Sequence, residues 1–182
     1  ITPDLKAGLA VNVPFGLATD YPAGWAGRYH ARESELQSVN VNPMLAYQVT
    51  DWLAVGGGPQ AQYVHARLTN AIDFGTITGA GQAANRDGAV ALEGSDWGFG
   101  YGLGALLTPA EGTRIGLGYR SRIDHGLDAD AHFTLDEAGL GRGLRAMNGS
   151  FRDTGARADL TTPATASLGV FQKVTPAWAV MG

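Results

Sequence analysis

The chain has 182 residues, a net charge of −4 and no cysteine, which excludes a disulfide framework and a cysteine-bound metal. It carries no basic cluster, which argues against nucleic acid as a partner. Charged residues make up only 16%, compared with about 25% in an ordinary soluble domain. Yet no stretch approaches the roughly 20 apolar residues of a membrane-spanning helix. Low charge without such a helix is typical of a membrane β-barrel, whose strands alternate.

Seven segments, taken in chain order, alternate large apolar residues with polar or small ones in steps of two, the period of a β-strand. The fourth interleaves its apolar residues with glycine, and the fifth places Ile123 opposite Arg120 and Arg122. Most are about as long as the 9–11 residues of a tilted membrane strand, rather than the 5–6 of soluble strands. The segments are 5–15, 38–49, 52–68, 97–107, 115–124, 160–170 and one that starts at 178.

The connections between these segments are alternately long and short. In an up-and-down barrel this rhythm places all long loops on one rim and all short turns on the other, as in outer-membrane barrels. Aromatic residues near the segment ends fit the girdles of such barrels. The long connections are 16–35, 73–96 and 136–156, the short ones are 50–51, 108–113 and 175–177, and the aromatic residues are Tyr47, Trp52, Trp97 and Trp178.

The sequence therefore predicts an all-β protein, an antiparallel up-and-down transmembrane β-barrel with about seven strands in this chain. A soluble β-sandwich is the alternative, because its strands also alternate and its turns have the same composition. Strand length and loop rhythm favour the barrel. Pro43 and Pro59 remove ladder donors, and we expect a bulge or a local break of the ladder at these positions.

An ordered set of segments carries a resemblance to a known family. The set begins with Pro14-Phe15-Gly16-Leu17 and the loop at 20–29, and it covers nearly the whole chain. It resembles strands and turns of the FadL/TodX family of outer-membrane transporters for long-chain fatty acids and aromatic hydrocarbons. The further segments are 39–47, 51–56, 61–63, 94–101, 113–121 and 174–179.

The resemblance implies a monomeric barrel of fourteen strands with an N-terminal hatch in its lumen. Residues 1–182 would then be a partial outer-membrane β-barrel domain, without the hatch and the remaining strands. The start at Ile1 and the end at Gly182, inside a new apolar run, lead us to expect part of a longer protein.

The implied function is transport of hydrophobic compounds, long-chain fatty acids or hydrocarbons, across the bacterial outer membrane by passive diffusion, with lateral exit through the wall. The implied partners are the hydrophobic small molecule and the lipid and lipopolysaccharide around the barrel. We expect no cofactor, no metal and no enzymatic activity: Asp124 and His125 near Ser121 point to opposite faces of a strand, and no Gly-x-Ser-x-Gly motif is present. The alternative is a structural or adhesive barrel whose long external loops bind a partner.

The first two long loops are implied to form the outer groove that captures substrate. Their aromatic residues could instead pack the loops against each other. Arg120 and Arg122 are expected on the inner face, because a charge in lipid would cost about 2–4 kcal/mol. They would clamp a carboxylate or form a structural network with the hatch. The family's basic ligand-binding position falls near Asn70, which favours a neutral substrate. The candidate substrate-binding residues are Phe15, Leu17, Tyr21, Trp25, Tyr29, Phe74, Ile77, Arg120 and Arg122.

Overall fold

The computed structural model describes residues 2–182 and consists mainly of one antiparallel sheet. Its ten strands form seven spans, because three spans are each interrupted once. The uninterrupted spans are β3 (Glu33–Thr50), β4 (Leu53–Asp73), β5 (Asp87–Ala110) and β10 (Trp178–Met181). The interrupted spans are β1 (Leu5–Asn12) with β2 (Gly16–Asp20), β6 (Thr113–Arg120) with β7 (Ile123–Thr134), and β8 (Thr154–Thr162) with β9 (Thr165–Thr175).

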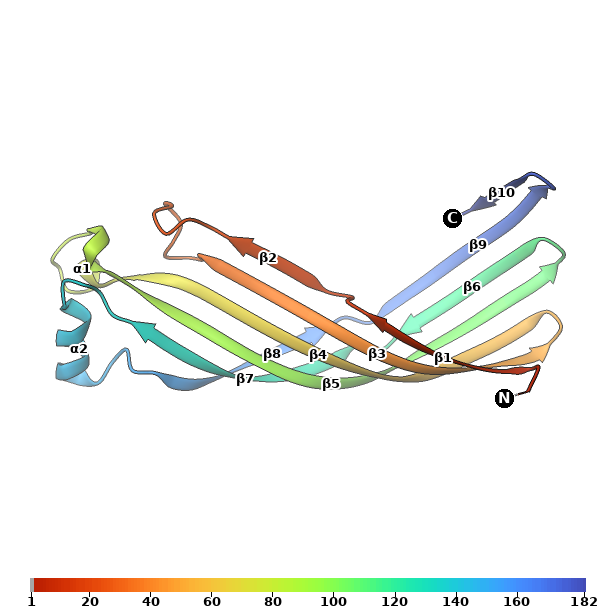
Figure 1. The fold of residues 1–182 in the computed structure, drawn as a ribbon, viewed down its shortest axis with the longest axis horizontal. Helices are drawn as coiled ribbons and strands as arrows, with labels where there is room; N and C mark the ends of the chain where they lie inside the picture. The colour runs from red at the N-terminus through yellow and green to blue at the C-terminus, as the bar shows by residue number, and fades with distance from the viewer. Residues whose placement is uncertain (1) are drawn as a thin grey trace.

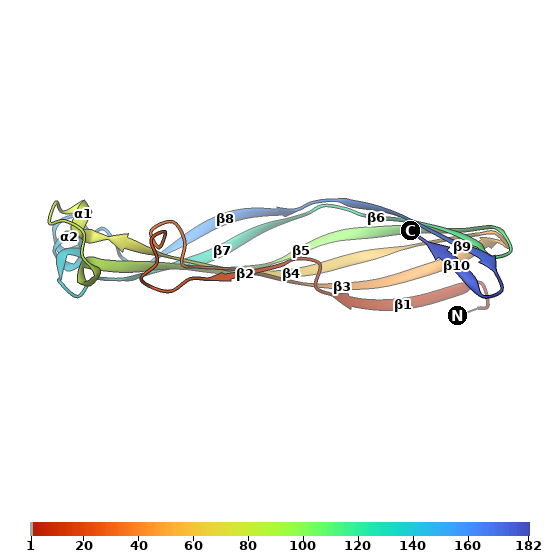
Figure 2. The same ribbon diagram turned by 90° about the horizontal axis from the view of Figure 1, so that it is seen from above.

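Consecutive spans lie side by side in an elongated, bent sheet (Figures 1 and 2). The three helical segments, α1 (Phe74–Ile77), η1 (Ala84–Arg86) and α2 (Leu140–Asn148), all belong to long connections at one end of the sheet. The short turns lie at the other end, so the predicted rhythm of the connections is confirmed. No helix within residues 2–182 is long and apolar enough to cross a membrane.

The strands reach further toward the helices than the sequence predicted. Residues 16–20 and 87–96 were assigned to loops, yet they continue β2 and β5. The reason is visible in β5. Near the turns its outer face carries Leu103, Phe99 and Trp97, but Ser95 and Glu93 follow on the same face. Because the outward residues become polar, the expected apolar alternation is lost while the strand goes on.

The outer face therefore has two zones. The zone near the turns is apolar and exposed; along β4 it covers residues 53–63, about the 9–11 residues that a tilted strand needs to cross a membrane. Tyr63 and Trp97 mark its edge, with ring centroids 5.4 Å apart. Beyond that edge Arg67 forms ion pairs with Glu33 (3.1 Å) and Glu93 (3.3 Å). The long strands therefore combine a lipid-facing band with an extension beyond it.

Each interrupted span contains one extra residue relative to β3–β5. Asn12 pairs with Asn40 but Gly16 pairs with Gln37, so three residues lie opposite two. Between the pairs Arg120–Gly102 and Asp128–Ser95, the β6–β7 span also has one residue more than β5. The β8–β9 span pairs with β6–β7 residue for residue, so it has the same extra residue relative to β5. An extra residue reverses which side chains face inward.

This reversal corrects two predictions. Ile123 was placed on the lipid face with Leu117, but it is buried on the inner face. Arg122 was expected on the inner face, but it lies outside beside Asp124, with an N–O distance of 3.7 Å and 74% of its side chain exposed. At Pro43 and Pro59 the structure has a local break and no bulge: residues 42–44 and 58–60 are not paired with each other, but the register between β3 and β4 is the same on both sides.

Candidate functional site

A belt of buried polar side chains crosses the inner face at the level of the interruptions. Gln62 is its centre: the His125 Nε2 atom lies 3.0 Å from Gln62 Oε1, and the Thr162 hydroxyl donates to the same oxygen at 3.0 Å. The Asn40 amide donates to Gln60 Oε1 at 3.4 Å. Because four strands contribute, the belt ties distant parts of the sheet together. Its members are Ser38, Asn40, Asn42, Gln60, Gln62, His125 and Thr162.

Glycines in β5 make room for this belt. A Cβ atom at Gly98 would lie 2.7 Å from His125 Cε1, and one at Gly102 would lie 2.9 Å from Gln60 Nε2. Both distances are shorter than side chains tolerate, so these positions accept only glycine without movement of their neighbours. The side chains of β4 and β7 can therefore lie over the β5 backbone and meet. The glycine alternation was visible in the sequence, but the belt it permits was not predicted.

A cavity of about 280 Å³ lies beside the belt and is lined by residues of all three interrupted spans. Phe15 and Pro14 come from the interruption between β1 and β2, and Arg120 comes from the end of β6. The Phe15 position is fixed by Ser38, whose hydroxyl accepts from the Phe15 N–H (3.0 Å) and donates to the Phe15 carbonyl (2.8 Å). The structure thus brings together Phe15 and Arg120, two of the predicted site residues.

Beyond the belt, toward the helices, the inner face is apolar. Val64 and Leu127 are 1% and 4% exposed, whereas Leu17 is 60% exposed and pairs with Leu36 in the neighbouring strand. Leu68 pairs with Leu92 on the same face. Leu17 is a predicted site residue, and it faces this apolar surface. Val64, Leu68 and Leu127 were not predicted as part of this surface, because the candidate site residues were taken from the long loops and from the fifth segment.

An aromatic cluster covers the inner face at the end of the sheet where the helices lie. Phe74 at the start of α1 is fully buried, and its ring centroid lies 4.9 Å from that of Phe151, which is 5.9 Å from Phe133. Phe151 has φ of 59°, an uncommon left-handed conformation for a residue with a side chain. The structure therefore places Phe74 inside a packed cluster, not on an open groove. Ile77, on the same helix, is 53% exposed at the rim.

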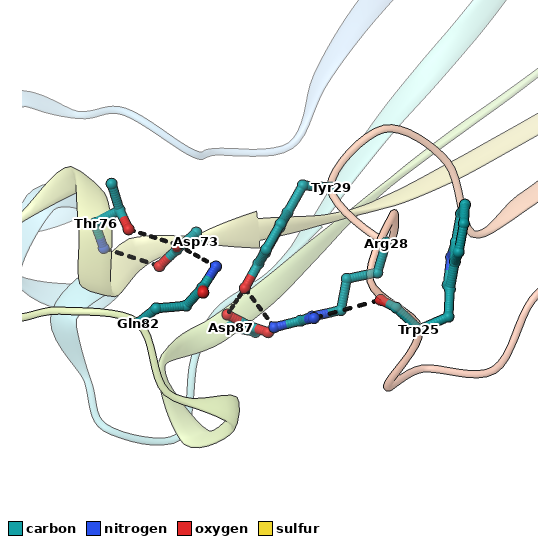
Figure 3. Close-up of polar contacts among 7 residues, drawn as sticks. All are labelled: Trp25, Arg28, Tyr29, Asp73, Thr76, Gln82 and Asp87. Atoms are coloured by element: carbon teal, nitrogen blue, oxygen red, sulfur yellow. Dashed lines mark hydrogen bonds and ion pairs between the residues drawn. The ribbon is translucent and has the colours of Figure 1, made fainter.

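The first long loop, residues 21–32, is fixed to the start of β5 by polar contacts (Figure 3). Arg28 Nε donates to Asp87 Oδ2 at 2.8 Å, and the Tyr29 hydroxyl donates to Asp87 Oδ1 at 2.9 Å. The Asp87 hydrogen bond raises the pKa of Arg28, and burial followed by Asp87 raises the pKa of Tyr29. Nearby, hydrogen bonds from Thr76 lower the pKa of Asp73. Tyr29 thus contributes to a structural network in this state.

The other two predicted residues of this loop also pack within it. Tyr21 and Trp25 stack with ring centroids 4.4 Å apart, and Trp25 Nε1 donates to the Ala31 carbonyl at 3.0 Å. The Trp25 ring occupies the space that a side chain at Gly27 would need. Tyr21 is largely exposed and Trp25 half-buried. These contacts lie within one loop, and a role of Tyr21 and Trp25 in substrate capture stays a prediction.

A family model described as outer membrane protein transport protein (OMPP1/FadL/TodX) matches residues 1–182. An outer membrane protein of Neisseria meningitidis is 32% identical over 193 residues, which cover 96% of this chain and 41% of that protein. The long-chain fatty acid transport protein of Escherichia coli is 26% identical over 191 residues, covering 95% of this chain and 43% of that protein. The chain thus spans less than half the length of these curated relatives.

Solved structures show the same fold. A FadL homologue from Pseudomonas aeruginosa superposes with a TM-score of 0.87 at 20% identity, over 97% of this chain and 44% of that one. The toluene transporter TodX of Pseudomonas putida gives a TM-score of 0.59 at 17% identity, over 100% and 50%. The open antiparallel sheet is therefore part of a β-barrel, as predicted.

Proposed function

Because the chain belongs to the family of outer membrane transport proteins that includes FadL and TodX, we propose that it forms part of a passage for hydrophobic compounds across the bacterial outer membrane. The substrates are long-chain fatty acids or hydrocarbons. This chain supplies one portion of the wall, and the passage is passive, driven by binding alone.

The observation that carries the proposal is the apolar inner face between the aromatic cluster and the polar belt. A transmembrane barrel for polar solutes has a polar interior. Here Leu17, Leu68 and Leu92 face inward beyond the lipid band, where the outer face is charged. Burying one methylene is worth about 0.8 kcal/mol, so such a wall draws an alkyl chain out of water without a covalent step.

We further propose a lateral exit beside Pro14. The belt blocks an apolar molecule from continuing straight through the lumen. Its passage would remove water from the amide groups, and an apolar molecule forms no hydrogen bonds with them that would offset this cost. At this level residues 13–15 leave the ladder with β3, and Pro14 and Phe15 line the adjacent cavity. An exit there delivers the molecule to the lipid band of the outer face.

Uptake by cells that carry the full-length gene tests the passage. A labelled fatty acid and a labelled aromatic hydrocarbon would be supplied to cells with wild-type protein, Leu17→Asn or Ala18→Asn. Leu17 faces inward and Ala18 outward on the same strand. We expect severalfold slower uptake with Leu17→Asn and nearly normal uptake with Ala18→Asn, at equal amounts in the outer membrane. Equal uptake by all three proteins contradicts the passage and favours the adhesive barrel.

A thiol-blocking experiment tests the exit separately. In a cysteine-free full-length background, Val13→Cys lies in the interruption and Val11→Cys lies in the ladder with β3; both native side chains are exposed. A bulky thiol reagent on position 13 should slow uptake, and the same reagent on position 11 should not. Equal effects at both positions exclude an exit at this place.

A further inference from the structure

We propose that Arg120 binds the carboxylate of an acidic substrate, so that this passage accepts fatty-acid anions through a site separate from the position near Asn70. The inference rests on the proposed passage and names its substrate class. It starts from the location of Arg120, the last residue of β6, where the extra residue of that span begins to reverse the alternation.

Arg120 lines two cavities on the inner face, of about 280 and 210 Å³. It is the only charged side chain among the residues that line either one in the described part of the chain. Two residues away, Arg122 points outward and lies 3.7 Å from Asp124. No carboxylate within residues 2–182 lies in ion-pair distance of Arg120. Within the described residues, which belong to a chain that spans less than half the length of its curated relatives, Arg120 thus lines two cavities without an acidic partner.

The neighbours of Arg120 are neutral hydrogen-bonding groups. Asn40 and Asn42 are 1% and 4% exposed, and the side-chain oxygen of each lacks a hydrogen-bond partner within the described residues. A buried amide without a partner is uncommon and needs an explanation. An amide binds a carboxylate only through its NH2 group, which Asn42 can present to the cavity after a half-turn, whereas the NH2 of Asn40 already donates to Gln60 Oε1. Asn40 lines the larger cavity with Arg120, and Asn42 the smaller.

The arrangement fits a molecule with one charged end. A guanidinium recognises a carboxylate through charge-assisted and often bidentate hydrogen bonds. The apolar surface that starts at Val64 and Leu127 continues away from the belt toward the helices and would hold the alkyl chain. The acidic side chain at this level, Asp96, lies on the other side of His125, 3.8 Å from its Nδ1 atom, and accepts from the Gly126 N–H. It is not among the residues that line the Arg120 cavities.

The test compares a long-chain fatty acid with its methyl ester, which has the same chain and no charge. Uptake of both labelled compounds is measured in cells with the full-length protein as wild type, Arg120→Gln or Arg122→Gln. With Arg120→Gln we expect at least tenfold slower uptake of the acid and less than a twofold change for the ester. The matched Arg122→Gln control should leave both rates unchanged, because Arg122 lies on the outer face.

The outcomes separate the two proposals. Loss of acid and ester together, or of neither, in Arg120→Gln overturns the carboxylate site while the passage stands. If wild-type cells take up neither compound, the proposed function fails.

A second measurement covers the case in which Arg120→Gln does not fold. A fatty acid labelled with ¹³C at its carboxyl carbon is bound to purified full-length wild-type protein and titrated by NMR. Contact with the guanidinium should hold the pKa of the bound acid below its value in the same detergent alone. An equal or higher pKa overturns the proposal.

Discussion

Near the short turns, the sheet carries Phe99 and Leu103 outward and glycine or amide groups inward; toward the helices, it carries Arg67 and Glu93 outward and Leu68 inward. The same strands thus reverse their polarity along their length. The half near the short turns has the pattern of a wall between lipid and a polar interior. The half near the helices resembles the wall of a soluble protein that encloses an apolar space. The difference teaches that strand alternation reports the local surroundings of each face, not a fixed inside and outside.

The largest expected effect tests where the lipid band ends. Leu103→Arg places a charge in the middle of the band and should destabilise the barrel by about 2–4 kcal/mol. Ser95→Arg lies on the same face of the same strand, beyond Trp97, and should change stability by less than about 0.5 kcal/mol. Urea unfolding of the full-length protein in lipid vesicles measures both. Equal losses would show that the band extends past Trp97.

The next effect tests the packing of the inner face. A methyl group at Gly98 meets the His125 ring, whereas one at Gly104 lies 3.5 Å from the Leu117 carbonyl, an ordinary contact. Gly98→Ala should therefore cost about 1–3 kcal/mol by overpacking. Gly104→Ala should be nearly neutral in the same unfolding experiment. A neutral Gly98→Ala would mean that the belt side chains do not lie over β5.

The smallest effect concerns the extension beyond the lipid band. Burial and Asp87 raise the pKa of Tyr29 above its ordinary value of 10.0, so the contribution of Tyr29 to loop stability is complete below pH 10.0 and is lost as pH rises through the higher pKa. Asp87→Asn should lower this pKa only in part, because burial, the larger cause, remains. Alkaline difference spectroscopy against a Tyr29→Phe control isolates this tyrosine. An unchanged titration would show that Asp87 does not act on it.

Much of the architecture could be predicted because it depends on local pattern. Period-two runs identified the spans, and the alternation of connection lengths placed the long connections on one rim. The extension of β5 over residues 87–96 was not predicted, because outward-facing Glu93 and Ser95 do not fit the apolar pattern of a membrane strand. Their meaning depends on what surrounds the strand, which a local pattern does not contain.

The site was predictable only in part. Arg120 faces inward as expected. Phe15 and Leu17 also face inward, although they were predicted for the outer capture groove, and the roles of all three residues stay predictions. Arg122 was placed on the wrong face because one extra residue reverses the alternation in its span. A period-two pattern does not mark such a residue. In the other two interrupted spans a proline lies at the interruption, Pro14 and Pro163, but this span has none. The aromatic cluster was not predicted, because Phe151 and Phe74 belong to two separate loops and come into contact only in the folded protein.

The three surplus residues have a consequence for how such a wall changes over generations. Inside β3, β4 or β5, a deletion of one residue would turn every following side chain to the wrong face. At residues 13–15, 121–122 or 163–164, the chain already restarts its pattern, so a gained or lost residue can be absorbed there. These points are where homologous chains can differ in length within a span, and where the chemistry of the two halves can evolve independently.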